Sequence, residues 1–451
     1  MNAMAEGPVC PMLTPPQARP GPAVLPFLGR VLAGLATAKG PLEHALRCRA
    51  AVGDVFTVDP PGAPPITYLL GRRGYRFMNR LPPEVAGIGQ VLSIVPMMSR
   101  WVSRSDSSPD WLEQLAIAGR AFLWRRLRRP EATREMAAAV EATVEAVTRD
   151  WPGTVDLADV LVALVHRVSL RCVAGPDAAA RLGEGGLACL RAMTAGVDVP
   201  RMALGATPAR YLLRDYWATR CFERLLRRVV AEHDAGAGVE LIDDLRSTMQ
   251  VGDARLDERD LPWALNYVCF NAVAYPGTYG FWSFVDMLAD DGVVRGIRGA
   301  SAEEAIRRAE HATLETIRRN PVTVAGRILK QEVRYPAAAH AGAPEYVIPA
   351  GTMVGSAPGS FTRDPAAHRD PDAYCPHRFA AGEAVPQLFG GGAFGCVAQR
   401  YVRALLPLVH TALLRRFGFR LIDALPPRRA RPALHYPRRP VRAIVTRLAS
   451  G

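Results

Sequence analysis

The stretch FGGGAFGCVAQRYVRALL spans Phe389–Leu406 and carries a single thiol, Cys396. A glycine cluster precedes this cysteine, and the residues after it have the pattern of an amphipathic helix. A thiol between a glycine-rich loop and a helix start can be a metal ligand, a nucleophile or a packed core residue. Free cysteines are often buried, so packing alone is one explanation. The rest of the chain has to distinguish these three roles.

Two kinds of cofactor site can use such a loop. Residues 390–395, GGGAFG, satisfy the G-x-G-x-x-G pattern of dinucleotide-binding loops. That site needs a preceding strand and an acid about 20 residues later, whereas here a proline-containing segment precedes and Arg415 and Arg416 follow. The second kind is a thiolate ligand. A helix start stabilises a thiolate, and glycine amide groups near the sulfur could tune an iron–thiolate centre.

Composition excludes several function classes. The 451 residues carry a formal net charge of +13, and among the 56 basic residues only Lys39 and Lys330 are lysines. The densest basic run, Arg125–Arg134, has no interleaved aromatic residues, so we expect no nucleic-acid binding. Docking of an acidic protein partner on a basic face fits this charge better.

The cysteines and the apolar segments indicate a cytoplasmic protein. The eight cysteines form no C-x-x-C pair in this long chain, which argues against a disulfide scaffold or a zinc site and favours a reducing cytoplasm. No secretory signal is visible, and the apolar run at 22–38 contains Arg30 and is too short for a membrane span.

The residue patterns predict one large, mostly helical domain over residues 21–451, after a flexible, proline-rich segment at 1–20. Residues 53–60 and 65–71 read as two strands. Residues 130–151, 154–175 and 397–416 read as helices, and short strands are expected after residue 330. Segment 260–292 is apolar on every side, so we expect a buried helix that Pro276 and Gly277 kink or open.

Three charged residues can form one buried network. Glu315 and Arg318 are three residues apart and share a helix face. Arg378, in the sequence PHRF, precedes the glycine loop. An E-x-x-R pair alone is common on solvated helices. The ordered set is specific: an apolar helix with a proline, then E-x-x-R, then an R-F turn, and finally F-x-x-G-x-x-x-C.

With these motifs the chain resembles the cytochrome P-450 superfamily over nearly its whole length. The resemblance implies a mainly α fold with small β-sheets, a triangular prism of helices around haem b (iron protoporphyrin IX). Cys396 would be the thiolate ligand of the iron, and Glu315, Arg318 and Arg378 would be structural. The other residues that the resemblance places at the haem are Arg327 and Arg120, at the propionates, and Phe389, Gly390, Gly392, Ala398 and Ala274.

The sequence departs from the family pattern at two places. The usual basic residue two positions before the cysteine is Phe394, and the usual glycine two positions after it is Ala398. The usual distal motif, A-G-x-(D/E)-T, reads AYPGT at 274–278. One register keeps Thr278 as the catalytic alcohol with Gly277 at the acid position. A second register, anchored on Phe281–Trp282, places Tyr275 at the position of the threonine. This register resembles relatives that lack the threonine.

The resemblance implies a monooxygenase that oxidises a small hydrophobic or aromatic substrate, with tailoring of specialised metabolites as one setting. Electrons would come from a ferredoxin or a flavin-containing reductase, and we expect a monomer without a transmembrane segment. Because neither distal register supplies a carboxylate, two alternatives stay open. One is peroxide-driven oxidation, oxidative coupling or rearrangement without ordinary oxygen insertion. The other is a haem-binding protein that is not a catalyst.

Overall fold

The computed structural model describes residues 41–59, 64–89, 91, 109–195, 208–249, 256–321, 325–336, 345–380, 388–392, 395–428, 436–437 and 439–449. The predicted flexible segment at 1–20 and the departure at Phe394 lie outside these residues.

Helices make up most of the described chain, which confirms the predicted fold class. The α-helices are α2 (Pro41–Val52), α3 (Gly71–Arg80), α6 (Pro109–Arg128), α7 (Ala132–Val147), α8 (Leu157–Ala174), α9 (Pro176–Ala195), α11 (Arg214–Glu232), α12 (Glu240–Met249), α13 (Leu261–Leu288), α14 (Asp291–Arg298), α15 (Ala302–Arg319), α16 (Gly359–Thr362), α17 (His377–Ala380) and α18 (Gln399–Arg416). Short 3₁₀ or π turns occur at Pro208–Leu212, His233–Ala237 and Glu258–Asp260.

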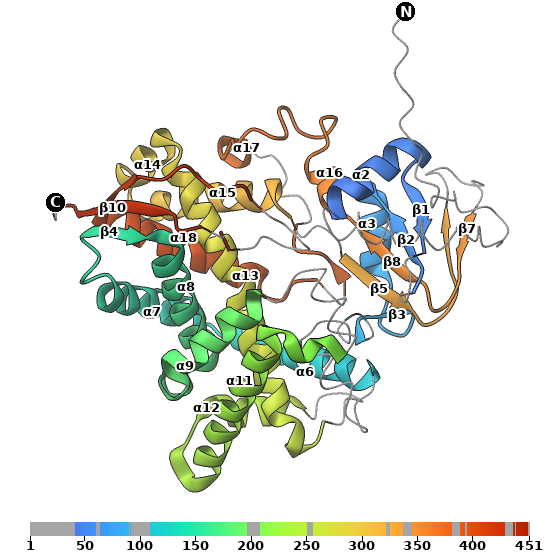
Figure 1. Cartoon of the computed structure of the whole chain (residues 1–451), viewed down its shortest axis with the longest axis horizontal. Helices are drawn as coiled ribbons and strands as arrows, with labels where there is room; N and C mark the ends of the chain where they lie inside the picture. Colours follow the sequence, from blue (N-terminus) through green and yellow to red (C-terminus); the bar gives the residue numbers. More distant parts are fainter. Residues whose placement is uncertain are drawn as a thin grey trace, which may run out of the picture.

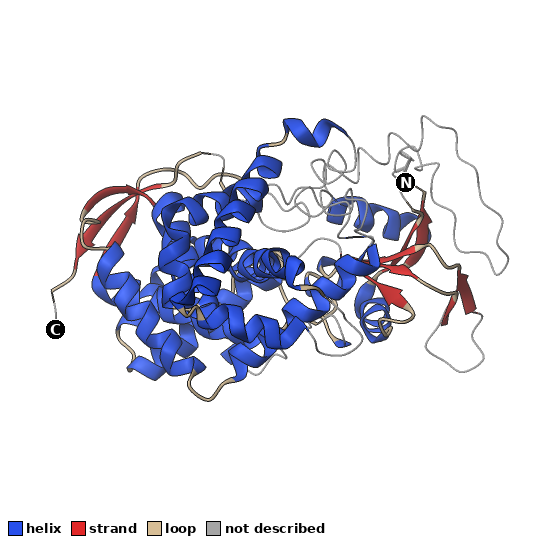
Figure 2. Cartoon of the chain, turned by 90° about the horizontal axis from the view of Figure 1, so that it is seen from below, coloured by secondary structure: helices blue, strands red, loops and turns tan. Residues whose placement is uncertain are grey.

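The strands form small sheets at opposite ends of the helical body (Figures 1 and 2). One sheet has the order β1-β2-β8-β5-β3, another β4-β10-β9, and a third pairs β6 with β7. The strands are β1 (Val55–Val58), β2 (Ile66–Leu69), β3 (Ala86–Gly87), β4 (Gly153–Asp156), β5 (Ala325–Leu329), β6 (Val333–Pro336), β7 (Glu345–Ile348), β8 (Met353–Ser356), β9 (Phe417–Leu421) and β10 (Arg442–Arg447).

Local signals set several of these elements where the sequence predicted them. The first two predicted strands pair antiparallel as β1 and β2, with Val55 opposite Leu69. Helix α8 begins at Leu157, three residues after the predicted start, because Gly153–Asp156 form strand β4; the Asp156 carboxylate then accepts from the Ala158 amide at 3.0 Å. The helix ends at Gly175, whose φ of 87° suits glycine at a helix end. Helix α18 begins at Gln399, two residues after the predicted start.

Helix α13 is the centre of the helical body (Figure 1). Every residue of this helix except Asn271, Tyr275 and Leu288 is buried, as its all-round apolar sequence predicts. The expectation that Pro276 and Gly277 open the helix is wrong, because α13 runs unbroken from Leu261 to Leu288. Pro276 removes one amide donor, but the side of this turn away from the cavity packs against α8, where His166 lies against Gly277 and Val165 against Gly280.

Candidate functional site

The cysteine loop is held in a tight conformation by its own backbone. The Cys396 amide donates to the Phe389 carbonyl at 2.7 Å, and the Gly395 amide donates to the Gly392 carbonyl at 3.1 Å. Gly390 and Gly392 have φ angles of 74° and 60°, a region that side chains other than glycine rarely adopt. A Cβ at Gly392 would also lie 2.0 Å from the Asn79 carbonyl oxygen on α3. These glycines are therefore needed for the loop to close against α3.

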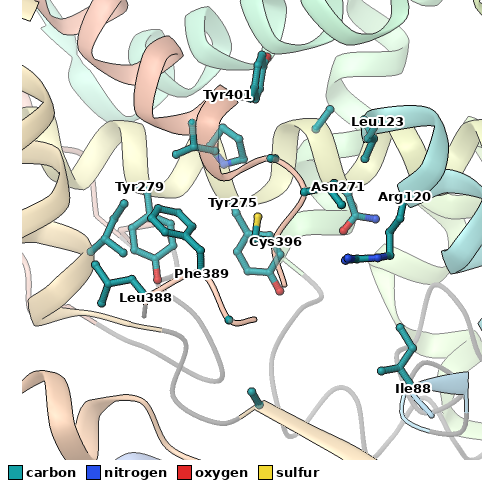
Figure 3. Close-up of a pocket in the computed structure, with 18 of the residues that line it drawn as sticks. Ile88, Arg120, Leu123, Asn271, Tyr275, Tyr279, Leu388, Phe389, Cys396 and Tyr401 are labelled. Atoms are coloured by element: carbon teal, nitrogen blue, oxygen red, sulfur yellow. The ribbon is translucent and has the colours of Figure 1, made fainter. Parts of the chain in front are cut away.

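The loop opens into a cavity of about 410 Å³ between the helical body and the five-stranded sheet. Helix α13 passes along this cavity, and Cys396 and Tyr275 both project into it (Figure 3). The lining comes from α3 (Tyr75, Met78, Asn79), α6 (Arg120, Leu123, Leu127), α13 (Tyr267, Asn271, Ala272, Tyr275, Pro276, Tyr279), β5 (Ala325, Gly326, Arg327), the loop (Leu388, Phe389, Gly390, Cys396, Val397, Ala398) and α18 (Tyr401, Val402), with single residues from elsewhere.

The Cys396 thiol faces the cavity, so its surface is accessible there although protein surrounds it. Burial raises the pKa of Cys396, and the Ala398 amide and the Arg120 guanidinium lower it against this effect. A thiol with a raised pKa stays protonated at neutral pH unless a cation replaces the proton. This environment suits a metal ligand better than a free nucleophile, which needs a lowered thiol pKa.

Two arginines on different elements line the same cavity. Arg120 of α6 donates to the Gly395 carbonyl at 2.8 Å, and Arg327 of β5 donates to the Leu81 carbonyl at 2.8 Å. Burial, and secondly the positive charge of Arg120, lower the pKa of Arg327 to about 10. Two cations that repel each other across a mostly apolar cavity would be stabilised by a ligand with a flat apolar body and anionic groups.

Glu315, Arg318 and Arg378 form the buried network that the sequence suggested. Arg318 donates to both Glu315 oxygens at 2.8 and 2.9 Å, and Arg378 donates to one of them at 3.2 Å. The Glu315 and Arg318 side chains are fully buried. The Cys375 amide also donates to Glu315 at 3.0 Å. Arg318 in turn binds the carbonyls of Thr362 and Pro371, both at 2.7 Å, so the network ties α15 to the segment before the cysteine loop.

The two candidate alcohols of α13 point in different directions. Tyr275 is half-buried and lines the cavity, as does Asn271 one turn earlier. Thr278 is buried, and its hydroxyl donates to the Tyr275 carbonyl at 3.1 Å and to the Ala274 carbonyl at 3.5 Å. Burial raises the pKa of Tyr275, with a second contribution from Cys396, so the phenol stays protonated.

The structure brings most of the predicted site residues together and leaves others outside. Cys396, Phe389, Gly390, Ala398, Arg120, Arg327 and Tyr275 line one cavity. Ala274 is buried and Gly392 is exposed, and the cavity wall is formed by their neighbours. Sequence reasoning missed Asn271, Tyr267 and Tyr279. Because every face of α13 is apolar in sequence, no periodic signal showed which residues face the cavity.

Comparisons with known proteins agree with this geometry. Residues 315–444 match the family described as cytochrome P450. Obtusifoliol 14-alpha demethylase of Triticum aestivum is 34% identical over 90 residues, 18% of this chain and 20% of that protein. The Sorghum bicolor enzyme is 33% identical over 90 residues, 18% of each chain. Sterol 14-demethylase of Arabidopsis thaliana is 32% identical over 89 residues, 18% of each chain. The match thus spans only about a fifth of the length of these relatives.

The overall fold has a solved counterpart. The retinoic acid-bound cyanobacterial CYP120A1 superposes with a TM-score of 0.70, covering 90% of this chain and 94% of that one at 14% sequence identity. Among the described residues, no helix is both long and apolar enough to cross a membrane. The cysteine loop and the buried Glu315–Arg318–Arg378 network both lie within the residues that match the cytochrome P450 family, and the chain as a whole shares the fold of this solved structure.

Proposed function

We propose that the protein is a haem-thiolate oxidoreductase, a monooxygenase, with haem b in the cavity and Cys396 as the ligand of its iron. The observation that supports this most is the Cys396 thiol facing a mostly apolar cavity that also receives Arg120 and Arg327. These residues fit the group. The sulfur is a soft ligand for iron, the apolar wall suits the macrocycle, and the two guanidinium groups suit its carboxylates.

When bound, a thiolate-ligated haem iron supplies oxygen chemistry, because electron density from the sulfur favours cleavage of an O–O bond. The protein would supply the surroundings of this group. Arg120 and Arg327 would hold the carboxylates, and Arg120 would also keep the cysteine loop in place through Gly395. Glu315, Arg318 and Arg378 would act structurally, by anchoring the chain that leads to the loop.

On α13, Tyr275 and Asn271 would bind and orient the second reactant. Tyr275 carries a protonated phenol at the cavity wall, so it can donate a hydrogen bond there and hold a proton that the reaction needs. Aliphatic side chains such as Ile88, Leu123 and Leu127 would exclude water. We propose a small hydrophobic or aromatic substrate, such as a specialised metabolite. The electron donor would be an acidic ferredoxin or a flavin-containing reductase, attracted by the +13 charge.

The test is the absorption spectrum of the purified protein. We expect bound haem, and a strongly red-shifted Soret band in the ferrous carbon monoxide complex. Cys396→His should abolish that band. Cys221→Ser, which changes an exposed cysteine, should keep it. If Cys396→His keeps the thiolate spectrum, or if the parent protein takes up no haem, the proposed function is wrong.

A second candidate is peroxide-driven oxidation or coupling, and one observation favours it. Helix α13 has no carboxylate from Leu261 to Val285. Its first acid is Asp286, whose carboxylate accepts hydrogen bonds from the Thr316 hydroxyl at 2.6 Å and from the Arg428 guanidinium at 3.0 Å. Proton delivery by a carboxylate at the cavity is therefore not available from this helix. Turnover that needs a reductant and electron carrier would support the monooxygenase, whereas turnover with hydrogen peroxide alone would support this alternative.

A further inference from the structure

Gly277 of α13 has a neighbour that leaves no room for a side chain. A Cβ at this position would lie 2.3 Å from Nε2 of His166 and 3.0 Å from the Tyr436 hydroxyl. His166 is on α8, and Tyr436 is on the segment between β9 and β10. The space that a carboxylate side chain would need at position 277 is thus filled by an imidazole and a phenol from two other parts of the chain.

His166 and Tyr436 form a hydrogen-bonded pair. The His166 Nε2 atom lies 2.9 Å from the Tyr436 hydroxyl oxygen, and the His166 side chain is 1% exposed. Burial, and secondly Arg191 of α9, lower the pKa of His166 to about 3, so the imidazole is neutral at physiological pH. Thr194 of α9 also interacts with the Tyr436 hydroxyl. The pair therefore joins α8, α9 and the C-terminal segment at one point on α13.

This point lies directly behind the cavity wall. Residues two apart on a helix are rotated by about 200°, so Gly277 faces away from the direction of Tyr275. Pro276, between them, has no amide hydrogen and cannot donate to the Ala272 carbonyl. One backbone hydrogen bond is thus missing in the turn that presents Tyr275 to the cavity. Side-chain contacts from behind must contribute more to holding this turn than they do in an ordinary helix.

We propose that His166 and Tyr436 are positioning residues, which fix the 274–278 turn of α13 and thereby the place of the Tyr275 phenol in the cavity. Glycine is required at 277 because the pair occupies the volume of any larger side chain. The inference concerns the protein alone and stands whether or not the cavity binds haem, so it can fail independently of the proposed function.

The test is fluorine NMR of the full chain labelled with 3-fluorotyrosine, recorded in the diamagnetic carbon monoxide form if the protein carries haem. The Tyr275 resonance is assigned by its loss in Tyr275→Phe. Tyr436→Phe removes only the hydroxyl of the pair, and Gly277→Ala forces the imidazole or α13 to move. We expect both to shift or broaden the Tyr275 resonance. His166→Gln retains a polar group that can reach Tyr436. This variant should leave the Tyr275 resonance near its original position.

The matched control is Tyr374→Phe. This variant removes a partly buried hydroxyl that donates to the Ala312 carbonyl of α15 at 3.3 Å. It should lose its own resonance and leave that of Tyr275 unchanged. Hydrogen exchange measured by mass spectrometry should be about fivefold faster across residues 272–280 in Tyr436→Phe, the factor expected for one lost hydrogen bond.

A folded Tyr436→Phe variant with an unchanged Tyr275 resonance and unchanged exchange would overturn the proposal. If Gly277→Ala does not fold, Tyr436→Phe decides alone. Should His166→Gln disturb the Tyr275 resonance as strongly as Gly277→Ala, the hydrogen bond would not be the positioning element, and the proposal would also be wrong.

Discussion

Arg120 reaches across the cavity edge and donates a hydrogen bond of 2.8 Å to the carbonyl oxygen of Gly395, the residue directly before Cys396. One side chain of α6 thus fixes the backbone of the cysteine loop, while its positive charge partly offsets the rise in the thiol pKa that burial causes. Arg120 therefore acts on both the loop and the second cation of the cavity, Arg327. Burial lowers the pKa of Arg327, and the charge of Arg120 lowers it further.

The first prediction concerns this contact. Arg120→Ala should accelerate haem loss at least about tenfold, because a hydrogen bond from a charged donor typically contributes about 1.5–3 kcal/mol. The measurement is haem transfer to an apo-globin acceptor. Arg125→Ala, on the exposed side of the same helix, should lose haem at the parent rate. Equal rates for Arg120→Ala and the parent would contradict a role for this contact.

The second prediction concerns the buried network. Glu315→Ala should lower the free energy of unfolding by about 3–5 kcal/mol, because it leaves Arg318 buried without its carboxylate partner. Denaturant unfolding checks this. Glu310→Ala, which removes a partly exposed pair with Arg403, should cost no more than about 1 kcal/mol. A folded, stable Glu315→Ala protein that has lost only turnover would show that Glu315 is catalytic instead of structural.

The third prediction separates the two alcohols of α13. Tyr275→Phe should lower the yield of product per reducing equivalent and raise hydrogen peroxide release, because Tyr275 presents its hydroxyl to the cavity. Thr278→Ala should change this yield little, because the Thr278 hydroxyl is bonded to carbonyls of its own helix. The opposite result, with loss only in Thr278→Ala, would place the threonine in the relay and the tyrosine outside it.

The fourth prediction concerns acid stability. Burial lowers the pKa of His166 to about 3 and that of His410 to about 4, from an ordinary value of 6.5. The unfolded chain therefore binds more protons between pH 6.5 and 4, and the free energy of unfolding falls as the pH falls through this window. Each histidine contributes up to about 1.4 kcal/mol per pH unit.

Denaturant titrations at pH 7, 6, 5 and 4.5 measure this slope. His410→Gln should flatten it, because the glutamine cannot titrate while its amide can still donate to the Gly280 carbonyl that lies 3.0 Å from His410. His377→Gln is the control, because this histidine is exposed at the start of α17. A parent and a His410→Gln variant with the same pH slope would contradict the assignment.

The sequence by itself determined the elements whose signals are local. Gly175 marks the end of α8, as predicted, because the end of a helix depends on a few neighbouring residues. Gly390 and Gly392 indicate the tight loop before Cys396 because only glycine adopts their φ angles readily. The ordered motifs from Glu315 to Cys396 were sufficient to predict the resemblance to the cytochrome P450 family and a mainly helical fold.

Only the tertiary structure decided which of these residues meet and which way they face. Helix α13 is apolar all round, so its sequence has no amphipathic period to show that Tyr275 lines the cavity and Thr278 does not. Pro276 indicated an interruption, yet the helix is continuous and packs against α8 on the side away from the cavity. In the sequence Gly277 is only the absence of an acid, whereas in the structure His166 and Tyr436 occupy the space of any side chain at this position. Contacts between residues more than a hundred positions apart depend on how whole helices and strands pack against one another. Local sequence patterns do not predict that packing.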